Sequence, residues 1–467
     1  MDFDFVVIGG GSAGYAAART AVDLGLKTAV IDGADELGGL CILRGCMPSK
    51  TLIESGNRFR TLRRAKEFGL RAGNLEVHGP EIIARKRRLI DDFASYRQEQ
   101  LQSGKFELIR GRAKYRSPTQ LEVELKDGGI REVNAATSVI ATGSVVSRLD
   151  LPGLDETGYL ISDDVLDLAE IPKSIIVLGG GPIALEMAHY LEALGSKVTV
   201  IQRSPNVLSS MDGDLAEVVE SAFRERGLEV YTGTKLTKAE TKSDGKVIHF
   251  EQDGEAKSVE AEQILQALGR SPATASLGLE AAGVATNRGR VSVEATQETS
   301  APNIFAAGDV CGPLEVVHLA IEQGETAAFN AALHLEKTEG IAKKMDYRLQ
   351  LFGVFTEPQV ASVGLSEKEL KTAGTPYDVE SYPFDDHGKS MVMGETHGFV
   401  KLIAEPETGK LLGGSVVGPE AVDLIHEVVV AMHFNGTSTD LARVPHYHPT
   451  LSEIWTYPAE ELAEKLA

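Results

Sequence analysis

Residues 5–14 read FVVIGGGSAG, an apolar run that leads into a turn with three spaced glycines. The apolar run predicts a buried strand over residues 5–8, and the stretch after the turn predicts a helix over residues 15–24. A further apolar run predicts a strand over residues 28–31, which ends at Asp32. This order of strand, glycine-rich turn, helix and strand predicts a nucleotide-binding unit of an α/β fold with a parallel sheet.

The glycines of this turn have separate physical roles. Gly9 permits the tight turn, Gly11 lets backbone N–H groups approach a pyrophosphate, and Gly14 lets the helix pack closely on the strand. The pyrophosphate then lies at the positive end of the helix. An acid at the end of the second strand accepts hydrogen bonds from a ribose, so Asp32 predicts a nucleotide with a free 2′-OH, such as the adenosine of FAD.

The same unit recurs further along the chain. Residues 174–184 read SIIVLGGGPIA, and Gly179, Gly181 and Ala184 take the three turn positions. The residue that ends the second strand, Gln202 here, follows the first turn glycine by 23 positions in both copies. One such turn is a weak signal, but two copies at one spacing predict two Rossmann-like dinucleotide-binding domains.

The second unit carries no acid where the first has one. Gln202 stands at that position, with Arg203 beside it. An arginine there can meet a 2′-phosphate, so NADP is favoured over NAD as the second nucleotide. The alternative is that Arg203 is a solvated surface residue.

Residues 38–50 read GGLCILRGCMPSK, with a Cys-x4-Cys spacing. In a straight helix Cys41 and Cys46 would be separated by about 7.5 Å along the axis, whereas a disulfide needs Cα atoms within about 7 Å. A bond between them therefore requires a distorted helix, which Gly45 permits. Cys46 would then begin a regular helix, a position that favours thiolate. A zinc site would need further ligands nearby, so no metal site is expected.

Residues 445–453 read PHYHPTLSE. His448 is followed by a proline and, five residues on, by Glu453, which makes an acid–base pair able to exchange protons with a thiol near neutral pH. His446 is interpreted as structural, and Cys311 as a buried free thiol.

The composition restricts the function further. The 467 residues suggest about three domains, and 47 basic against 68 acidic residues give a net charge of −21. This charge argues against nucleic-acid and anionic-membrane partners, and the basic run at residues 85–88 is interpreted as a solvated helix face. No apolar run reaches 18 residues and the N-terminus lacks a basic leader, so we expect a cytoplasmic protein with no membrane segment.

Taken in order, these motifs resemble those of the FAD-dependent pyridine nucleotide–disulfide oxidoreductases that carry a Cys-x4-Cys pair. The resemblance covers essentially the whole chain. It implies that Gly308 and Asp309 form a second FAD motif, that Lys50 pairs with Glu186 near the flavin, and that the dithiol relays electrons. The remaining candidate cofactor-binding residues lie where one domain gives way to the next: Gly143, Gly269 and Arg270.

The resemblance also implies an α/β fold with two Rossmann-like domains and a C-terminal α+β dimerisation domain. The expected domains are residues 1–147 and 271–340 for FAD, 148–270 for NAD(P), and 345–467 for dimerisation. In this family the His–Glu pair serves the dithiol of the other subunit, so a homodimer is expected. Cys46 would lie nearer the flavin and Cys41 nearer solvent, where it attacks the substrate sulfur.

The subclass is most similar to dihydrolipoamide dehydrogenase, because residues 355–364, FTEPQVASVG, and the HPTLSE ending follow that branch. The expected substrate is lipoamide or a similar small disulfide or dithiol, and a lipoyl-bearing protein is a candidate partner. Leu40 and the Gln202-Arg203 junction depart from that branch, so an NADPH-dependent reductase of another disulfide or of a metal ion stays open. A non-catalytic redox-sensing flavoprotein is the alternative from a different class, and the soluble transhydrogenases of this fold lack the two cysteines.

Overall fold

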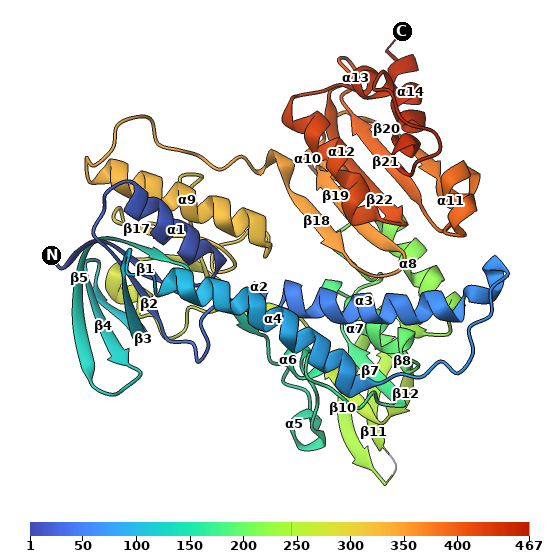
Figure 1. Ribbon diagram of the computed structural model, residues 1–467, viewed down its shortest axis with the longest axis horizontal. Coiled ribbons are helices and arrows are strands. Elements are labelled where there is room, and N and C mark those ends of the chain that lie inside the picture. Colours follow the sequence, from blue (N-terminus) through green and yellow to red (C-terminus); the bar gives the residue numbers. More distant parts are fainter. Residues whose placement is uncertain (244, 467) are drawn as a thin grey trace. The chain divides into compact units, whose positions relative to one another are not determined.

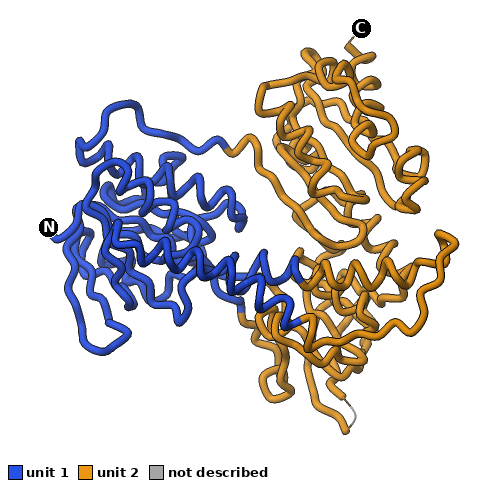
Figure 2. Tube along the Cα trace, in the orientation of Figure 1, with its two compact units in different colours: residues 1–51, 83–147, 270–346 blue, residues 52–82, 148–269, 347–467 orange. Residues whose placement is uncertain are grey.

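The computed structural model describes residues 1–243 and 245–466. Their contacts divide the chain into two compact units, each assembled from three separate stretches (Figure 2). The stretches of unit 1 are 1–51, 83–147 and 270–346, and those of unit 2 are 52–82, 148–269 and 347–467.

Unit 1 is built on a sheet of mainly parallel strands (Figure 1). The parallel strands, in spatial order, are β3 (Glu107–Ser117), β2 (Thr28–Asp32), β1 (Phe3–Ile8), β5 (Ile130–Ile140) and β17 (Ile304–Ala306), and β4 (Gln120–Leu125) runs antiparallel between the far halves of β3 and β5. All five residues of β2 are buried, as expected for a parallel strand covered on both faces.

Two helices pack together on this sheet, α1 (Ser12–Asp23) and α9 (Val317–His334). They approach closely because the contact is made by small residues: a Cβ on Gly324 would lie 2.2 Å from the carbonyl oxygen of Ala13. Helix α1 begins three residues before the predicted start, because Gly11 already has the extended N-cap conformation. The first helical N–H groups therefore belong to the glycine turn itself.

The middle stretch of unit 2 repeats this plan in smaller form. Its parallel strands, in spatial order, are β13 (Gln263–Gln266), β7 (Ser174–Leu178), β8 (Lys197–Ile201) and β9 (Glu229–Tyr231), and α7 (Pro182–Ala193) follows β7. An antiparallel sheet follows, made of β10 (Thr234–Lys242), β11 (Gly245–Gln252) and β12 (Glu255–Ala261).

The C-terminal stretch of unit 2 has one antiparallel sheet. Its strands, in spatial order, are β18 (Leu351–Val354), β19 (Gln359–Gly364), β22 (Leu411–Gly418), β21 (Phe399–Ala404) and β20 (Asp378–Pro383). Helix α12 (Ala421–His433) packs on this sheet (Figure 1). The fully buried Trp455 belongs to the same core and donates its indole N–H to the carbonyl oxygen of Leu424 at 3.1 Å.

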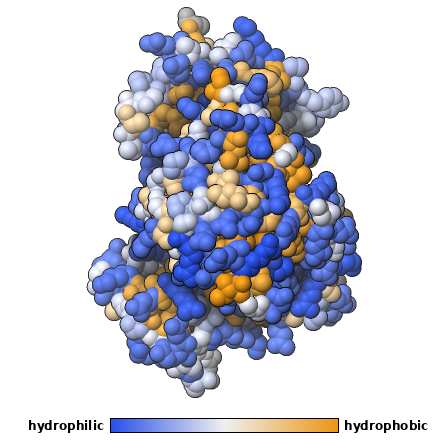
Figure 3. Space-filling view, turned by 90° about the vertical axis from the view of Figure 1, so that its left-hand side faces the viewer, coloured by the Kyte–Doolittle hydropathy of each residue, from blue (hydrophilic) through white to orange (hydrophobic). Residues whose placement is uncertain are grey.

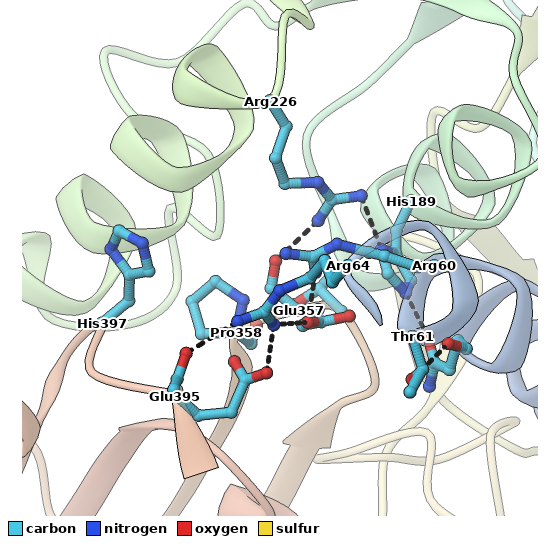
Figure 4. A network of polar contacts seen from close by, with 12 residues as sticks. Arg60, Thr61, Arg64, His189, Arg226, Glu357, Pro358, Glu395 and His397 are labelled. Carbon is cyan, nitrogen blue, oxygen red and sulfur yellow. Dashed lines mark hydrogen bonds and ion pairs between the residues drawn. The ribbon is translucent and has the colours of Figure 1, made fainter. Parts of the chain in front are cut away.

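Residues 52–82 are part of unit 2. A half-buried polar network at the end of helix α3 (Cys46–Arg63) connects this stretch to the rest of the unit (Figure 4). Arg60 and Arg64 both form ion pairs with Glu357, in the turn between β18 and β19. Arg226 donates to the backbone carbonyl of that same glutamate at 2.7 Å. Glu357 lies about 300 positions after Arg60 and Arg64, so no local sequence pattern predicts these ion pairs.

The basic run at residues 85–88 is not a uniformly solvated face, which corrects the interpretation from sequence. It lies in helix α4 (Gly79–Leu101), and Lys86 is only 5% exposed. Arg85 donates to the carbonyl oxygen of Thr51 at 3.2 Å. One side of the run therefore packs inward, while Arg87 and Arg88 are exposed.

The surface is dominated by hydrophilic side chains on the face shown in Figure 3. Among the described residues, no helix is long and apolar enough to cross a membrane.

Candidate functional site

The first glycine turn is shaped by close approaches of backbone atoms. A Cβ on Gly14 would lie 1.8 Å from the carbonyl oxygen of Gly9, so any side chain there would force the turn apart. A Cβ on Gly9 would lie 2.4 Å from the carbonyl oxygen of Ala141, on the neighbouring strand. At Gly11 the nearest atom is 3.9 Å away. The turn is thus tight towards the protein and open at Gly11, as a cradle for a pyrophosphate requires.

Asp32 lies at the end of β2 and closes the other side of the turn. One carboxylate oxygen accepts from the N–H of Gly10 at 2.7 Å, and the other accepts from the N–H of Ala34 at 2.9 Å. Arg110 lies 3.5 Å from the same group. Oδ1 also accepts from Arg110, whereas Oδ2 accepts only from Gly10 among the described residues. The carboxylate is thus fixed in orientation, and Oδ2 can still accept from a ribose hydroxyl.

The loop that precedes the two cysteines lies against the glycine turn. A Cβ on Gly39 would lie 2.6 Å from the Cα of Gly11, so the two backbones touch. Gly39 also has φ = +79°, in the region that glycine adopts readily. This contact explains why glycine stands just before the dithiol: it brings the loop up to the turn predicted to hold FAD.

The cysteines occupy two helices separated by a break. Cys41 lies in α2 (Leu40–Leu43), and Cys46 begins α3. Arg44 leaves the helical conformation with φ = −138°, and a Cβ on Gly45 would lie 3.2 Å from the Cα of Cys41. The predicted distortion at Gly45 is thus present, and it brings the two thiols together.

The two thiols are unbonded and in contact. A hydrogen bond with Cys46 raises the pKa of Cys41, and burial raises it further. Lys50 acts in the opposite direction. Cys41 therefore keeps its proton at neutral pH and needs a base before it can act as a nucleophile. Cys41 is half-buried and Cys46 is exposed, and the order in which they approach the flavin stays a prediction.

Arg97 was not identified from the sequence. Its guanidinium lies 4.1 Å from the ring centroid of Tyr15, and two of its nitrogens are buried without a hydrogen-bond partner among the described residues. Burial lowers the pKa of Arg97, while Tyr15 and Cys41 oppose that effect. A cation thus lies within electrostatic reach of Cys41 and forms no ion pair with any described carboxylate.

In the second FAD motif, the predicted residues Asp309 and Arg270 are connected through the hydroxyl of Ser144. Asp309 accepts a hydrogen bond from the hydroxyl of Ser144 at 2.7 Å, and Arg270 donates to the same hydroxyl at 2.8 Å. Ser144 follows Gly143 and was not singled out from the sequence. Gly308, which precedes Asp309, donates its N–H to the side-chain carbonyl of Gln323 at 2.8 Å.

The second glycine turn, in unit 2, follows the first with one difference. A Cβ on Gly179 would lie 2.4 Å from the carbonyl oxygen of Ala267, and Gly181 has no atom within 4 Å of that position. The third position is Ala184, which is fully buried. The Cβ of Ala184 would lie 3.6 Å from a Cβ on Gly179, which is an ordinary van der Waals distance, so alanine fits at this position. Gly269, which ends the stretch at residues 148–269, has φ = +102°.

Gln202 and Arg203 lie at the edge of this turn. The side chain of Gln202 lies against Gly180, and its carbonyl accepts from the N–H of Arg203 at 3.0 Å. Arg203 is exposed and forms no ion pair among the described residues. Its guanidinium is therefore available to an anion from solvent.

Lys50 and Glu186 belong to different units, so their pairing stays a prediction. Glu186 is only 4% exposed, and its carboxylate accepts from the N–H of Phe355 at 3.1 Å. Its place in the first half of α7 is fixed within unit 2.

The predicted acid–base pair is formed. His448 Nδ1 lies 3.0 Å from Glu453 Oε2, and the imidazole is largely exposed while the glutamate is buried. His446 instead contacts Glu427 at 2.5 Å and the carbonyl oxygen of Val444 at 2.8 Å, as expected of a structural histidine. His387 approaches the other oxygen of Glu453 at 3.4 Å, and no sequence motif pointed to this residue.

Cys311 is a buried free thiol, as predicted. Burial raises its pKa to about 12. It is therefore an inert structural residue.

The residues present fit the two nucleotides. The open backbone at Gly11, the oriented Asp32 carboxylate and the Ser144–Asp309 pair would hold FAD in unit 1. Gly181 and the unpaired Arg203 would hold NAD(P) in unit 2. When bound, these groups supply hydride and electron transfer.

Comparison with known proteins gives two family matches. The model described as "Pyridine nucleotide-disulphide oxidoreductase" matches residues 3–324. The model described as "Pyridine nucleotide-disulphide oxidoreductase, dimerisation domain" matches residues 352–459. Together the two matches include every motif described above.

Curated relatives and solved structures match nearly the whole chain. A dihydrolipoyl dehydrogenase of Bacillus subtilis is 35% identical over 466 residues, which covers 97% of this chain and 96% of the relative. LpdA from Mycobacterium tuberculosis superposes with a TM-score of 0.86 at 31% identity, covering 98% of this chain and 99% of that one. The HOCl-induced flavoprotein disulfide reductase RclA from Escherichia coli, as a Cu(II) complex, superposes with a TM-score of 0.85 at 26% identity, covering 99% of each chain.

Proposed function

The chain belongs to the pyridine nucleotide–disulphide oxidoreductase family, as a flavoprotein disulfide oxidoreductase, and we propose that it passes electrons between NADPH and a small cyclic disulfide of the lipoamide type. The contact between the Cys41 and Cys46 thiols carries this proposal. Two thiols that touch across a helix break can close to a disulfide and open again with little backbone movement.

The relay is a pair of thiol–disulfide exchanges. In the reducing direction, the Cys41 thiolate attacks one sulfur of the substrate, whose S–S bond breaks. This step releases the other substrate sulfur as a thiol and leaves a mixed disulfide between Cys41 and the substrate. The Cys46 thiolate then attacks the Cys41 sulfur, the substrate sulfur bonded to Cys41 leaves as the second thiol, and the Cys41–Cys46 disulfide forms. When bound, FAD and NADPH would supply the two electrons that reopen this disulfide.

His448 moves the protons. The raised pKa of Cys41 means that this thiol must lose its proton before it attacks. Glu453 holds His448 Nδ1 at 3.0 Å, which leaves Nε2 free to accept that proton. The pair lies within the residues matched by the dimerisation domain, which supports a homodimer in which it serves the partner subunit's dithiol.

One feature of the chain supports NADPH as the nucleotide, and its relatives support lipoamide as the substrate. Gln202 removes the carboxylate that would repel a 2′-phosphate, and Arg203 is unpaired, which favours NADPH. Curated relatives from Bacillus subtilis and Thermus scotoductus are named dihydrolipoyl dehydrogenases, which supports lipoamide. A cyclic disulfide suits this chemistry, because its second sulfur stays tethered as the leaving group.

A second candidate substrate class rests on Arg97. An arginine near Cys41 with no carboxylate partner would favour a disulfide that carries an anionic group. RclA, whose name is that of a disulfide reductase, shares this fold. An NADPH-dependent reductase of such a disulfide is therefore the alternative to a lipoamide enzyme.

A substrate panel separates the two. Lipoamide, its free-acid form lipoate, glutathione disulfide and mercuric ion are each offered with NADH and with NADPH to the purified holoenzyme. We expect lipoamide turnover, with NADPH preferred. Lipoate turned over much faster than lipoamide, and slowed by Arg97→Gln, would favour the anionic class. No turnover of any disulfide would exclude the proposed function.

A further inference from the structure

Glu453 has a second histidine neighbour on the side away from His448. His387 Nε2 lies 3.4 Å from Glu453 Oε1, while His448 Nδ1 lies 3.0 Å from Oε2. His387 precedes the short helix α11 (Gly388–Met393) and is 61 positions upstream of His448. The carboxylate is thus flanked by an exposed imidazole and a wholly buried one.

The buried imidazole is fixed from every side. Its Nδ1 lies 2.8 Å from the hydroxyl of Ser390, which is also fully buried. The rings of Phe384 and Tyr457 pack edge-on against it, each with centroids 6.4 Å apart. Tyr382 stacks on Tyr457 and donates its hydroxyl to the carboxylate of Asp386 at 2.9 Å.

These contacts select one tautomer. Burial lowers the pKa of His387, although Glu453 opposes this, so the ring is neutral at pH 7. A lone pair on Nε2 would face a carboxylate oxygen, which is unfavourable. The hydrogen therefore lies on Nε2 and points towards Glu453, and Nδ1 accepts from the hydroxyl of Ser390.

We propose that His387 is a positioning residue for the acid–base pair: it holds Glu453 in the orientation that fixes His448 as the Nδ1–H tautomer. Nε2 of His387 is buried with no hydrogen-bond partner among the described residues, and the carboxylate oxygen at 3.4 Å is the acceptor that it faces. A small shortening of this contact completes a line from Ser390 through His387 and Glu453 to His448.

The neutral charge of His387 matters for this role. A lysine or arginine at that place would form an ion pair with Glu453 and compete with the imidazolium that His448 becomes when it takes a proton. A neutral N–H donor orients the carboxylate and leaves its negative charge to stabilise that imidazolium.

This inference rests on the proposed function, and two variants test it. His387→Phe keeps a planar ring but removes the donor, whereas His387→Gln places an amide N–H near the position of Nε2. We expect His387→Phe to slow the oxidation of the reduced enzyme by lipoamide roughly tenfold, as loss of an orienting partner does, and His387→Gln to restore most of that rate. Reduction of the flavin by NADPH should not change in either variant, because it does not use the dithiol's base.

The direct readout is the tautomer of His448 in 15N NMR spectra of histidine-labelled holoenzyme. We expect one ring nitrogen of His448 to be the protonated one in the wild type and in His387→Gln, and a mixture of tautomers in His387→Phe. His446→Gln is the matched control, because His446 has its own carboxylate, Glu427, and should alter neither readout.

The outcomes are separable. An unchanged His448 tautomer and an unchanged oxidation rate in folded His387→Phe would overturn the proposal. If that variant does not fold, Ser390→Ala takes its place: it removes only the donor to Nδ1, and a wild-type spectrum and rate there would overturn the proposal equally. A wild-type enzyme that no disulfide reoxidises would refute the proposed function instead, while the tautomer signal would still report on His387.

Discussion

The two glycine-rich turns differ by one methyl group at their third position, which is Gly14 in the first turn and Ala184 in the second. Gly14 tolerates none, because a Cβ would lie 1.8 Å from the carbonyl oxygen of Gly9, whereas Ala184 carries one at the same place of the second turn. We expect Gly14→Ala to yield protein with little bound FAD, measured as the ratio of absorbance at 450 and 280 nm. Ala184→Gly is the control: it should keep FAD and lose about 1 kcal/mol of stability from its helix. Full FAD content in Gly14→Ala would contradict the predicted site.

The roles of the thiols are tested at Cys41. Cys41→Ser should abolish disulfide reduction and leave reduction of the flavin by NADPH intact, because only the exchange with substrate needs this sulfur. Stopped-flow absorbance separates the two half-reactions. Cys311→Ala removes the buried third thiol and should keep full activity. Disulfide turnover by Cys41→Ser at the wild-type rate would remove Cys41 from the relay.

Arg203 is expected to set the preference for NADPH over NADH. Replacing it with glutamine removes one charge-assisted contact, worth about 1.5–3 kcal/mol, so kcat/KM for NADPH should fall at least tenfold. The value for NADH should hardly change, because that nucleotide has no 2′-phosphate. Gln202→Glu should go further and raise the value for NADH. An equal loss with both nucleotides would mean that Arg203 contacts a part common to both.

Sequence could reveal these residues because each lies within a short motif. The spacing between neighbouring residues identifies the turn glycines, the two cysteines and the His448–Glu453 pair. His387 could not be found in that way. Its importance arises from a contact with a glutamate 66 positions later, and nothing in its own surroundings marks it.

At the scale of elements, strand β21 carries a buried charge. Lys401, on β21, is 3% exposed at its side chain and contacts the carboxylates of Asp212, Asp214 and Glu367 at 2.7–3.1 Å. Two of these lie beside helix α8 (Gly213–Glu225), and the third begins α10 (Glu367–Ala373). Lys401→Met should therefore destabilise the protein by about 3–5 kcal/mol, because it removes the cation that compensates the buried carboxylate of Asp212. Lys371→Met, which removes an exposed neighbour, should cost much less.

This cluster also predicts a pH dependence. Burial alone would raise the pKa of Glu367, but hydrogen bonds from Lys371, Tyr377 and Lys401 lower it to about 2, below the ordinary value of 4.5. A lowered pKa adds stability that is present above pH 4.5 and lost as the pH falls towards 2. Urea midpoints measured between pH 6 and pH 3 should fall less steeply in Glu367→Gln than in the wild type. Parallel slopes would mean that Glu367 does not contribute.

The elements themselves were largely predictable, because buried parallel strands are apolar runs and each glycine turn marks the strand before it and the helix after it. Contacts between residues far apart in the sequence could not be predicted. In residues 52–82, Arg60 and Arg64 pair with Glu357, which is distant in the sequence. Lys86 is buried although it lies in a run of charge. Tertiary contacts decided both.

For the whole molecule, the order of motifs indicated the family, since each nucleotide turn, the dithiol and the His–Glu pair stand in the expected sequence. The fold class and the dimerisation domain follow from the family matches. Sequence alone could not say which units the stretches would form, because a domain interrupted twice along the chain is defined by contacts that no local pattern encodes.

We expect two inactive variants to recover activity when their subunits are mixed in one homodimer. If the dithiol of one subunit works with the acid–base pair of its partner, then Cys41→Ser and His448→Ala damage different halves of a shared site. A mixed dimer then combines both defects in one site and leaves the other intact. Random exchange makes about half of the dimers mixed, so about a quarter of the wild-type activity should return.

The experiment separates the composite site from a site within one subunit. Each variant is first shown to be inactive alone, and exchange is followed with two affinity tags. Within one subunit, neither half of a mixed dimer would be complete, and no activity would return. A His446→Ala subunit serves as the control: mixed with Cys41→Ser, it should behave like the wild-type subunit, because His446 has a structural contact with Glu427 and no part in the exchange. Activity that stays at zero in confirmed mixed dimers would place His448 beside the dithiol of its own chain.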